Sequence, residues 1–469
     1  MQKRPRNYWK NMKILFVSSE VVPFAKTGGL ADVAGALPKA LSALGEEVIV
    51  FTPRYKKTDP VKFKLKSINP EISVGTLPGS KVKVYFFEHY DFFGSREELY
   101  QVKGCDYPDN LERFTAFCQK VLSFIKEIGW TPDVIHCNDW QTGLIPAHLK
   151  TGGSKIASVY SVHNMEYLGL FSKEKLLSTG LGWEEYTPEK MEFWNNISLG
   201  KAGLVYADAV CTVSETYAKE IQTPEYGCGL DGLLRERSKD VYGIVNGIDY
   251  DIWDPAIDPC IAKHYSADNI EDKLENKLEL QKDFNLPMVA GIPLIGIVSR
   301  LADQKGFDIL AGAIEEIMKL KCQLVLLGTG DPKYHKLFTE MMVKYPEHIS
   351  VKLGFNAALA QQIYAGSDFF LMPSRYEPCG LGQLISFRYG TIPIVRKTGG
   401  LADTVHPGEG FIFEEYSSSA LLDSIKRAVA FHKKNGAAWK EQLRRIMELD
   451  YSWGSSAKKY IELYRKVKL

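Results

Sequence analysis

The sequence lacks both a net charge and a long hydrophobic run. Its 469 residues include 58 basic and 57 acidic side chains, which leaves a formal net charge of +1. That balance gives no reason to expect a nucleic acid or an anionic membrane as the main partner. No apolar run approaches the roughly 20 residues that a membrane-spanning helix needs. We therefore expect no nucleic-acid partner and no membrane partner.

Several sequence signatures of common enzyme classes are also missing. The eight cysteines form no CxxC pair and no spacing typical of a metal site, so we expect reduced thiols in a cytoplasmic protein. There is no GxxxxGK[ST] loop, which argues against an ordinary NTPase, and no GxSxG elbow. The stretch from Gly328 to Asp331 is too short for a GxGxxG dinucleotide fingerprint, so a nicotinamide enzyme is poorly supported.

The N-terminus combines basic residues with a short apolar run. Lys3, Arg4 and Arg6 precede the apolar run at residues 14–17, and polar residues follow that run at once. The run is too short for a signal peptide. The pattern predicts a buried first strand behind a loose basic tail.

The heptapeptide KTGGLAD occurs twice, at residues 26–32 and 397–403. Each copy follows an apolar run and precedes a helix-compatible sequence. Glycine pairs expose main-chain amides, and a strand, a glycine turn and a helix start in that order are typical of anion sites. The repeat predicts two related halves with a negatively charged ligand between them.

Short β-branched apolar runs alternate with longer amphipathic segments along the whole chain. Continuous apolar runs indicate strands that are covered on both faces, as in parallel sheets flanked by helices. Two helices are expected at 110–128 and 359–366. The expected strands are 13–19, 47–53, 133–139, 157–164, 208–214, 242–248, 293–300, 322–330, 349–355, 368–374 and 391–397.

The expected fold is α/β, with two doubly wound, Rossmann-like domains. Turn residues cluster at 245–255 between the two series of strands, which places a boundary there. We expect an N-terminal domain at 1–250, a nucleotide-sugar domain at 251–450, and a C-terminal helix within 451–469 whose packing the sequence leaves open.

Polar residues follow the predicted strands, where parallel sheets bind their ligands. Lys26, Arg300 and Lys305 supply three cations beside glycine amides, a combination that favours a diphosphate. Glu377 is a carboxylate of the kind that sugar hydroxyls, or a developing glycosyl cation, would select. Any one of these residues, taken alone, is as compatible with a helix cap or a surface ion pair as with a ligand site.

Seven motifs, in order, resemble bacterial glycogen synthases and plant starch synthases. They cover most of the chain and read KTGGLADV, DYPDNLERF, HCNDWQTGLIP, SVHNMEYLG, VNGID, SRLADQKG and SRYEPCGLGQL. The resemblance implies a GT-B fold, with two Rossmann-like domains facing a deep interdomain cleft. It also implies retaining transfer of glucose from ADP-glucose to the non-reducing end of an α-1,4-glucan such as glycogen.

The resemblance also implies roles for individual residues. The implied catalytic residues are Lys26, Asp139, His163, Arg300, Lys305 and Glu377. The implied donor-binding residues are Gly28, Gly29, Asn246, Phe355, Cys379, Gly380, Leu381 and Gly382. The implied acceptor-side residues are Tyr100, Asp106, Asn110 and Arg113. No metal and no other cofactor is implied.

Two positions depart from the family pattern. Gly382 stands where relatives often carry threonine, and Phe355 stands where tyrosine is common. Both changes bear on donor affinity rather than on the reaction. The family favours a same-face mechanism through a short-lived ion pair, whereas double displacement would need a carboxylate nucleophile such as Asp139 or Glu377. The sequence leaves both mechanisms open.

Two alternatives to this activity are a same-fold transferase that uses UDP-glucose or another acceptor, and an inactive glucan-binding scaffold. The paired KTGGLAD copies together with DYPDN disfavour the first alternative. The complete set of Lys26, Arg300, Lys305 and Glu377 disfavours the second.

Overall fold

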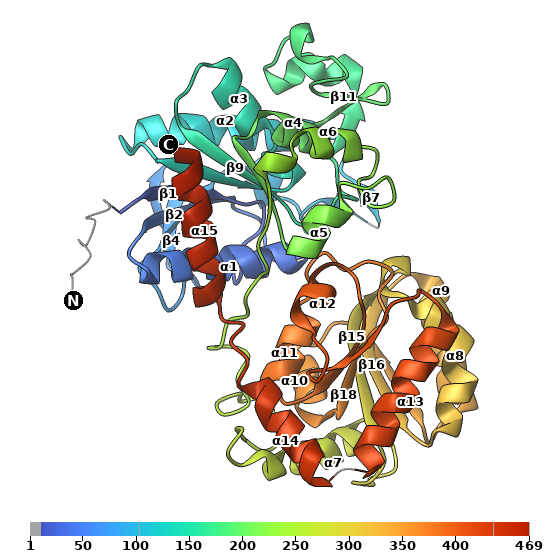
Figure 1. Cartoon of the computed structure of the whole chain (residues 1–469). Helices are drawn as coiled ribbons and strands as arrows, with labels where there is room; N and C mark the ends of the chain where they lie inside the picture. The colour runs from blue at the N-terminus through green and yellow to red at the C-terminus, as the bar shows by residue number, and fades with distance from the viewer. Residues whose placement is uncertain (1–10, 103, 435, 469) are drawn as a thin grey trace, which may run out of the picture. The chain divides into compact units, whose positions relative to one another are not determined.

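A computed structural model of the chain describes residues 11–102, 104–434 and 436–468, so the basic stretch around Lys3 lies outside the described residues. The chain folds into two compact α/β units (Figure 1). Unit 1 consists of the chain up to Val213, the segment Ala218–Ile244 and the end of the chain from Trp453. Unit 2 consists of Ser214–Tyr217 and Val245–Ser452. The main division, at 244/245, therefore falls before the boundary expected at 250/251, and the first unit is not one continuous segment.

Unit 1 is built on a nine-stranded sheet with the order β14-β13-β9-β8-β1-β2-β5-β4-β3. Its strands are parallel except that β4 runs antiparallel to both β3 and β5. The order in which successive strands are added to the sheet reverses at β1, which pairs with β2 on one side and with β8 on the other. The strands are β1 Lys13–Val17, β2 Glu47–Pro53, β3 Lys66–Asn69, β4 Ile72–Thr76, β5 Lys83–Phe87, β8 Val134–Asn138, β9 Ala157–Val162, β13 Ala209–Thr212 and β14 Val241–Gly243.

Helices and two small sheets complete unit 1. The small sheets are β6 Gln101–Val102 with β7 Cys105–Asp106, and β10 Leu170–Ser172, β12 Asn196–Ser198 and β11 Glu192–Phe193. The helices are α1 Gly29–Ala43, α2 Asn110–Glu127, α3 Leu144–Thr151, α4 Leu199–Tyr206, α5 Glu215–Glu220, α6 Asp231–Glu236 and α15 Trp453–Lys468. The short helix α5 begins in the segment Ser214–Tyr217 of unit 2 and ends in unit 1. Short turns of 3-10 or π helix are η1 Tyr90–Gly94, η2 Trp140–Thr142, η3 Lys173–Thr179, η4 Trp183–Glu185 and η5 Ser238–Asp240.

The C-terminal helix α15 belongs to unit 1, where it packs against α1 and β9 (Figure 1). Its buried residues Trp453, Ala457, Tyr460 and Tyr464 recur at helical spacing and join the core cluster of that unit. The hydroxyl of Tyr464 lies 2.6 Å from Nδ1 of the buried His136 on β8. The end of the chain therefore covers one face of a sheet whose first strand lies near the start of the chain.

Unit 2 has a six-stranded, all-parallel sheet with the order β17-β16-β15-β18-β19-β20. Numbered within the unit this order is 3-2-1-4-5-6, the arrangement of a nucleotide-binding Rossmann fold. Its switch point lies between β15 and β18. The strands are β15 Leu294–Leu301, β16 Gln323–Gly330, β17 Ile349–Leu353, β18 Phe369–Met372, β19 Ile392–Arg396 and β20 Phe411–Phe413.

Helices flank the sheet of unit 2 and bury their apolar faces in two core clusters. Helix α8 shows why, because its buried residues Leu310, Ala313, Ile314 and Ile317 recur at the spacing of one helix face. The helices are α7 Lys273–Asp283, α8 Phe307–Lys319, α9 Pro332–Lys344, α10 Ala357–Gly366, α11 Gly382–Arg388, α12 Gly399–Thr404, α13 Ser418–Lys434 and α14 Gly436–Met447, with the short 3-10 turns η6 Ile270–Asp272 and η7 Asp303–Lys305.

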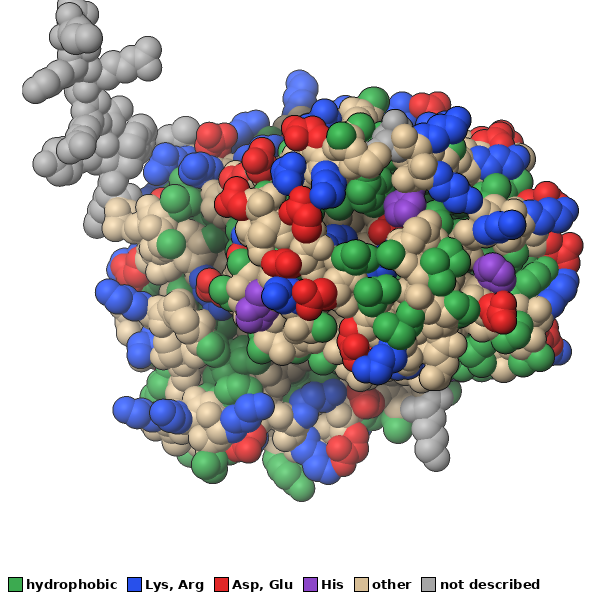
Figure 2. Space-filling model, turned by 90° about the horizontal axis from the view of Figure 1, so that it is seen from below, with side chains coloured by type: hydrophobic (Ala, Val, Ile, Leu, Met, Phe, Trp, Pro, Cys, Tyr) green, Lys and Arg blue, Asp and Glu red, His purple; other side chains and the backbone are tan. Residues whose placement is uncertain are grey.

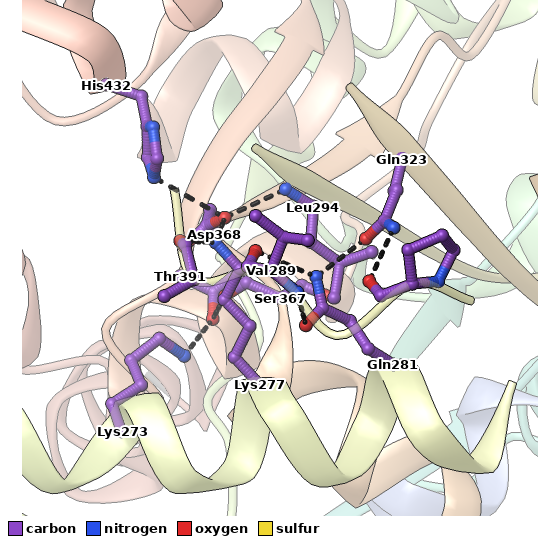
Figure 3. Close-up of polar contacts among 12 residues, drawn as sticks. Lys273, Lys277, Gln281, Val289, Leu294, Gln323, Ser367, Asp368, Thr391 and His432 are labelled. Carbon is purple, nitrogen blue, oxygen red and sulfur yellow. Dashed lines mark hydrogen bonds and ion pairs between the residues drawn. The ribbon is translucent and has the colours of Figure 1, made fainter. Parts of the chain in front are cut away.

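A group of polar side chains is buried between α7 and the amino ends of β15, β18 and β19 (Figure 3). Lys277 Nζ lies 2.6 Å from an oxygen of Asp368. Lys273 Nζ donates to the main-chain oxygens of Ala365 and Tyr389 at 2.6 and 2.9 Å, at the C-terminal ends of α10 and α11. These partners offset the cost of burying two ammonium groups. The group lies at the amino edge of the sheet, away from the carboxyl edge where the predicted site residues follow the strands.

The surface mixes charges of both signs. On the face that Figure 2 shows, Lys and Arg side chains are interspersed with Asp and Glu side chains. This distribution agrees with a net charge of +1. Among the helices of the described residues, none is both long and apolar enough to cross a bilayer.

Candidate functional site

In unit 1, the candidate residues gather where β1 and β8 end. Asp139 directly follows β8 and has a φ of 55°, a left-handed conformation that is costly for a residue with a side chain. Its carboxylate accepts the main-chain N–H of His163 at 2.8 Å. Burial raises the pKa of Asp139 to about 7, against the effect of that hydrogen bond. A strained carboxyl group with a pKa near neutrality is a feature of functional sites.

His163 follows β9, the strand next to β8. Its Nε2 lies 3.0 Å from the amide oxygen of Asn138, and the amide nitrogen of Asn138 donates to the main-chain oxygen of Val17 at 2.9 Å. Since an amide oxygen only accepts, Nε2 of His163 carries the proton. Burial lowers the pKa of His163 to about 4. The imidazole is therefore neutral near pH 7 and is a hydrogen-bonding group rather than a cation.

Polar groups of the first glycine loop, residues 26–29, form hydrogen bonds with acidic side chains of the protein itself. Lys26 Nζ lies 2.7 and 2.8 Å from the two carboxylate oxygens of Asp32. The main-chain N–H of Gly28 donates to Glu20 at 3.1 Å, so this amide is not open to a phosphate as the sequence suggested. Gly29 is the first residue of α1, and a Cβ there would have no atom within 4 Å. The loop keeps a cation and one glycine at the surface.

Glu20 is a site residue that the sequence reasoning missed. It follows β1 by three residues, and its buried carboxylate also accepts the hydroxyl of Tyr100 at 3.1 Å. The signal was present, because the rule that selects Asp139 after β8 also selects Glu20 after β1. The repeated KTGGLAD, which begins shortly after Glu20, is the more conspicuous signal.

The predicted acceptor-side residues divide into supporting and exposed groups. Arg113 is fully buried and donates to the main-chain oxygens of Phe92 and Leu99 at 2.7 and 3.0 Å. Asn110 is also buried and donates to the main-chain oxygen of Tyr100 at 3.0 Å. Both residues therefore hold the predicted acceptor-side segment in place from inside. Asp106 is exposed, and Tyr100 is half-buried.

In unit 2, the predicted residues lie at the switch point of the sheet. Lys305 Nζ and Glu377 Oε2 form an ion pair at 2.7 Å, and Ser374 donates to the same oxygen at 2.9 Å. Arg300, near the end of β15, is exposed and contacts Gln304 at 3.4 Å. The structure thus brings Lys305 and Glu377 directly together, although the sequence reasoning gave them separate roles.

The second glycine loop packs against the segment that carries Glu377. The N–H of Gly400 lies 3.0 Å from the main-chain oxygen of Glu377. Gly399 has a φ of +44°, and a Cβ there would lie 2.0 Å from the same oxygen. Asp403 accepts the N–H and the hydroxyl of Thr216 at 2.8 and 2.5 Å. This copy of KTGGLAD supports the Glu377 segment, while the first copy pairs its lysine with its own aspartate.

The remaining predicted donor-side residues differ in exposure. Asn246 is buried, and its side-chain oxygen has no hydrogen-bond partner within the described part of the chain. Phe355, just after β17, is 83% exposed, which leaves its ring open for stacking. Burial raises the pKa of the Cys379 thiol to about 12, so this group is protonated near pH 7. Gly380 has a φ of +73°, and Leu381 precedes α11.

Gly382 is the first residue of α11, and its lack of a side chain has a local cause. A Cβ at this position would lie 2.7 Å from the ring of Phe370 and 3.2 Å from the sulfur of Met372. The aromatic neighbour fills the space that a threonine would need. The departure from the family pattern is therefore matched by the packing around it.

The described residues contain no group of three or more His, Cys, Asp or Glu side chains placed to hold a metal ion. All eight cysteines are free thiols. The chemistry of the described site residues is that of cations, carboxyl groups, a neutral imidazole and an exposed aromatic ring.

Known proteins resemble this chain over nearly its full length. Residues 13–236 match the family model described as the starch synthase catalytic domain, and residues 279–445 match glycosyl transferases group 1. The chain is 49% identical to a glycogen synthase of Desulforudis audaxviator, over 97% of this chain and 96% of the relative. It is 48% identical to a glycogen synthase of Moorella thermoacetica, over 97% of each.

Solved structures agree with this relationship. The catalytic domain of starch synthase IV from Arabidopsis thaliana, bound to ADP and acarbose, matches with a TM-score of 0.90 and 33% identity, covering 98% of this chain and 100% of that one. A sucrose-phosphate synthase from Thermosynechococcus elongatus matches with a TM-score of 0.62 and 19% identity over 97% and 99%, a likeness of fold alone. The predicted α/β, GT-B fold class is thereby confirmed. The chain belongs to the glycogen synthase family and is a glycosyltransferase enzyme.

Proposed function

We propose that the protein transfers glucose from ADP-glucose to the non-reducing end of an α-1,4-glucan, elongating glycogen with retention of configuration. The observation that carries this proposal is the likeness to glycogen synthases at 49% identity over 97% of the chain. The starch synthase IV domain that resembles the chain was solved with ADP and acarbose, which supports an adenine nucleotide as the leaving group.

Residues of unit 2 are suited to the donor. The exposed ring of Phe355 offers a stacking face for adenine. Arg300 and Lys305 would neutralise the diphosphate as charge builds on it in the transition state. An ammonium group has three hydrogens, so the bond from Lys305 to Glu377 leaves two for phosphate oxygens. Leu381 and Gly382 would meet phosphate through main-chain groups.

The sugar ring needs hydrogen-bonding groups and negative charge. The unpartnered oxygen of Asn246 would accept a glucose hydroxyl, since a buried orphan acceptor in a native protein calls for a partner. Glu377 would hold glucose hydroxyls and offset positive charge on the ring, and the amides of Cys379 and Gly380 would add further contacts. His163 would hold a sugar hydroxyl as a neutral imidazole, because its pKa is lowered to about 4.

In unit 1, Lys26, Gly29 and Asp139 are the groups we assign to the reacting centre, with Tyr100 and Asp106 on the acceptor side. Retention would proceed on one face of the sugar, with the leaving phosphate helping to deprotonate the incoming hydroxyl. The cations assigned here make a metal unnecessary. The enzyme would therefore work without a cofactor.

The decisive experiment offers the purified protein ADP-glucose or UDP-glucose together with glycogen and follows release of the nucleoside diphosphate. We expect a strong preference for ADP-glucose, with radiolabelled glucose appearing in α-1,4 linkage on the glycogen. Equal or reversed use of UDP-glucose would overturn the donor assignment. Absence of transfer from either donor would favour an inactive glucan-binding scaffold.

The metal-free proposal has its own test. The same assay is run after dialysis against EDTA and again after addition of magnesium or manganese. We expect the rate to stay within about twofold of the untreated enzyme, because side-chain cations supply the charge stabilisation. Loss of activity that a divalent cation restores would contradict this part of the proposal.

A further inference from the structure

We infer that Glu20 is a positioning residue for glucose transfer, whose carboxylate holds the Lys26–Gly29 loop and Tyr100 in one arrangement. The inference rests on the proposed function and adds to it a residue that acts through its neighbours. Glu20 follows β1, the strand at which the order of strand addition reverses in unit 1, and Asp139 follows the adjacent strand β8. Ligands of open parallel sheets bind beyond such a point.

Three donors from two distant segments meet on this one carboxylate. Oε2 of Glu20 accepts the consecutive main-chain N–H groups of Thr27 and Gly28 at 2.5 and 3.1 Å. Oε1 accepts the hydroxyl of Tyr100 at 3.1 Å, and that hydroxyl lies 2.7 Å from Ser19 Oγ. The glycine loop and the segment of Tyr100 therefore have no freedom to shift independently while the carboxylate stays in place.

Glu20 is itself held tightly. The residue is 4% exposed, and its main-chain N–H and C=O both contact the hydroxyl of Ser18, at 3.4 and 2.7 Å. Burial raises the pKa of Glu20, while the hydrogen bonds from Thr27, Gly28 and Tyr100 favour its charged form. These three hydrogen bonds offset the desolvation of the carboxylate, and they fix its partners at the same time.

This arrangement also decides which groups of the loop face a ligand. The N–H groups of Thr27 and Gly28 would otherwise form a small anion site of their own. Glu20 supplies the anion from within the protein, so a phosphate has no access to these two amides. What the loop presents outward is the half-exposed ammonium of Lys26 and the open position of Gly29. Glu20 thereby sets the position of Lys26 without touching a substrate.

The test compares Glu20→Asp and Glu20→Gln with the wild-type chain. The aspartate is one methylene shorter and cannot reach both Thr27 and Tyr100. The glutamine keeps an oxygen for the two N–H groups, and its amide can donate to Tyr100. We expect Glu20→Asp to lower kcat about 10- to 100-fold, as small misplacements do, with KM for ADP-glucose changed less than about threefold. We expect Glu20→Gln to recover kcat to within about fivefold of wild type, because it restores the geometry.

Asp59 provides a matched control. One of its oxygens also accepts two main-chain N–H groups, of Val61 and Lys62 at 2.8 and 3.1 Å, but the residue is exposed and serves only its own turn. We expect Asp59→Ala to keep wild-type kcat. A Glu20→Asp variant with wild-type kcat would overturn the inference. So would a Glu20→Gln variant as slow as Glu20→Asp, since the charge and not the geometry would then be what matters.

A second readout does not depend on the reaction. Trypsin cleaves after lysine, and mass spectrometry can follow the fragment that ends at Lys26. We expect faster cleavage there in Glu20→Asp than in wild type, Glu20→Gln or Asp59→Ala, because the loop is released. Unchanged cleavage in Glu20→Asp would overturn the inference, whether or not the wild-type chain uses ADP-glucose. Failure of the wild-type chain to use ADP-glucose would instead overturn the proposed function.

Discussion

At the scale of single residues, the ion pair of Lys305 and Glu377 is partly buried, with side chains 18% and 8% exposed. We predict that Lys305→Ala and Glu377→Ala each lower kcat about 100-fold or more, since each removes charge stabilisation from the reacting centre. Each single variant also leaves the other charge without its partner, so the double variant should be less destabilised than the two single effects added together. Kinetics with ADP-glucose and glycogen, together with thermal unfolding, measure both effects.

Lys397 and Glu414 are a suitable comparison for that pair. They also lie 2.7 Å apart, but their side chains are 55% and 75% exposed. An exposed ion pair contributes only about 0 to 1 kcal/mol, so Lys397→Ala should leave stability and kcat close to wild type. Near-normal turnover in Lys305→Ala, or a large loss in Lys397→Ala, would show that the two lysines have been assigned the wrong roles.

Asp139 gives a prediction for the pH dependence of stability. Its pKa is about 7 in the folded protein and 3.8 ordinarily, so the folded state binds the proton more tightly. Stability from this group is therefore fully present below about pH 4 and is lost as pH rises through 7. Asp139→Asn removes this loss while its side-chain oxygen can still accept from His163.

We therefore expect Asp139→Asn to match wild type near pH 4 and to exceed it in free energy of unfolding near pH 8. A shift of about three units corresponds to roughly 4 kcal/mol, which is the upper limit of the gain. Denaturant titrations of both proteins at each pH measure this gain. The contributions of the buried histidines His136 and His163 are common to both proteins and cancel in the difference. A constant difference across this range would mean that the carboxyl group does not titrate as described.

Prediction from the sequence was good at this scale where strand ends mark the residue and poor where burial decides its role. Asp139, His163 and Asn246 lie after strands, as expected. Arg113 could not be recognised as internal, because two of its partners are main-chain oxygens 14 and 21 residues away. A sequence does not show which carbonyl groups the fold will aim at one guanidinium.

At the scale of elements, the two KTGGLAD loops allow a matched pair of substitutions. A Cβ at Gly28 would have no atom within 4 Å, and its φ of −140° is open to any residue. A Cβ at Gly399, in the glycine pair of the second copy, would collide with the main-chain oxygen of Glu377, at a φ of +44°. We predict that Gly399→Ala costs at least about 2 kcal/mol, whereas Gly28→Ala costs less than about 1 kcal/mol.

Thermal unfolding of the two variants compares these costs directly. The kcat of Gly399→Ala should also fall, because its side chain displaces the segment that holds Glu377. Equal stability losses in the two variants would contradict the different roles of the loops.

The parallel sheets could be predicted well, because their strands are continuous β-branched runs. All eleven predicted strands are present, and the helices expected at 110–128 and 359–366 are Asn110–Glu127 and Ala357–Gly366. The strands β3, β4, β5 and β20 and the small sheets were not predicted, because none of these short sequences contains a continuous β-branched run. Helix α7 reads as a surface helix, yet Lys273 and Lys277 are buried, with partners about 90 residues further along. Their burial depends on tertiary contacts that periodicity does not encode.

At the scale of the whole molecule, the first unit depends on the last helix. Trp453, Ala457, Tyr460 and Tyr464 of α15 are all part of its core. We predict that deleting residues 453–469 prevents unit 1 from folding cooperatively, because an apolar face of its sheet would be exposed. Circular dichroism and thermal unfolding of the shortened protein test this.

Two single substitutions, one at a buried and one at an exposed position of α15, test the contribution of this helix to stability without deleting it. Tyr464→Phe leaves the buried Nδ1 of His136 without its partner and should cost about 1 to 3 kcal/mol. Lys458→Ala, at an exposed position of the same helix, should cost less than about 0.5 kcal/mol. A shortened protein as stable as wild type would show that α15 is dispensable.

The return of α15 to unit 1 also has a consequence for synthesis on the ribosome. Unit 2 is complete once Ser452 has been translated, whereas unit 1 still lacks the segment from Trp453. Domains commonly fold during translation in the order in which they are made. Here that order is reversed at the last step: the half of the protein that leaves the ribosome first is the half that is finished last.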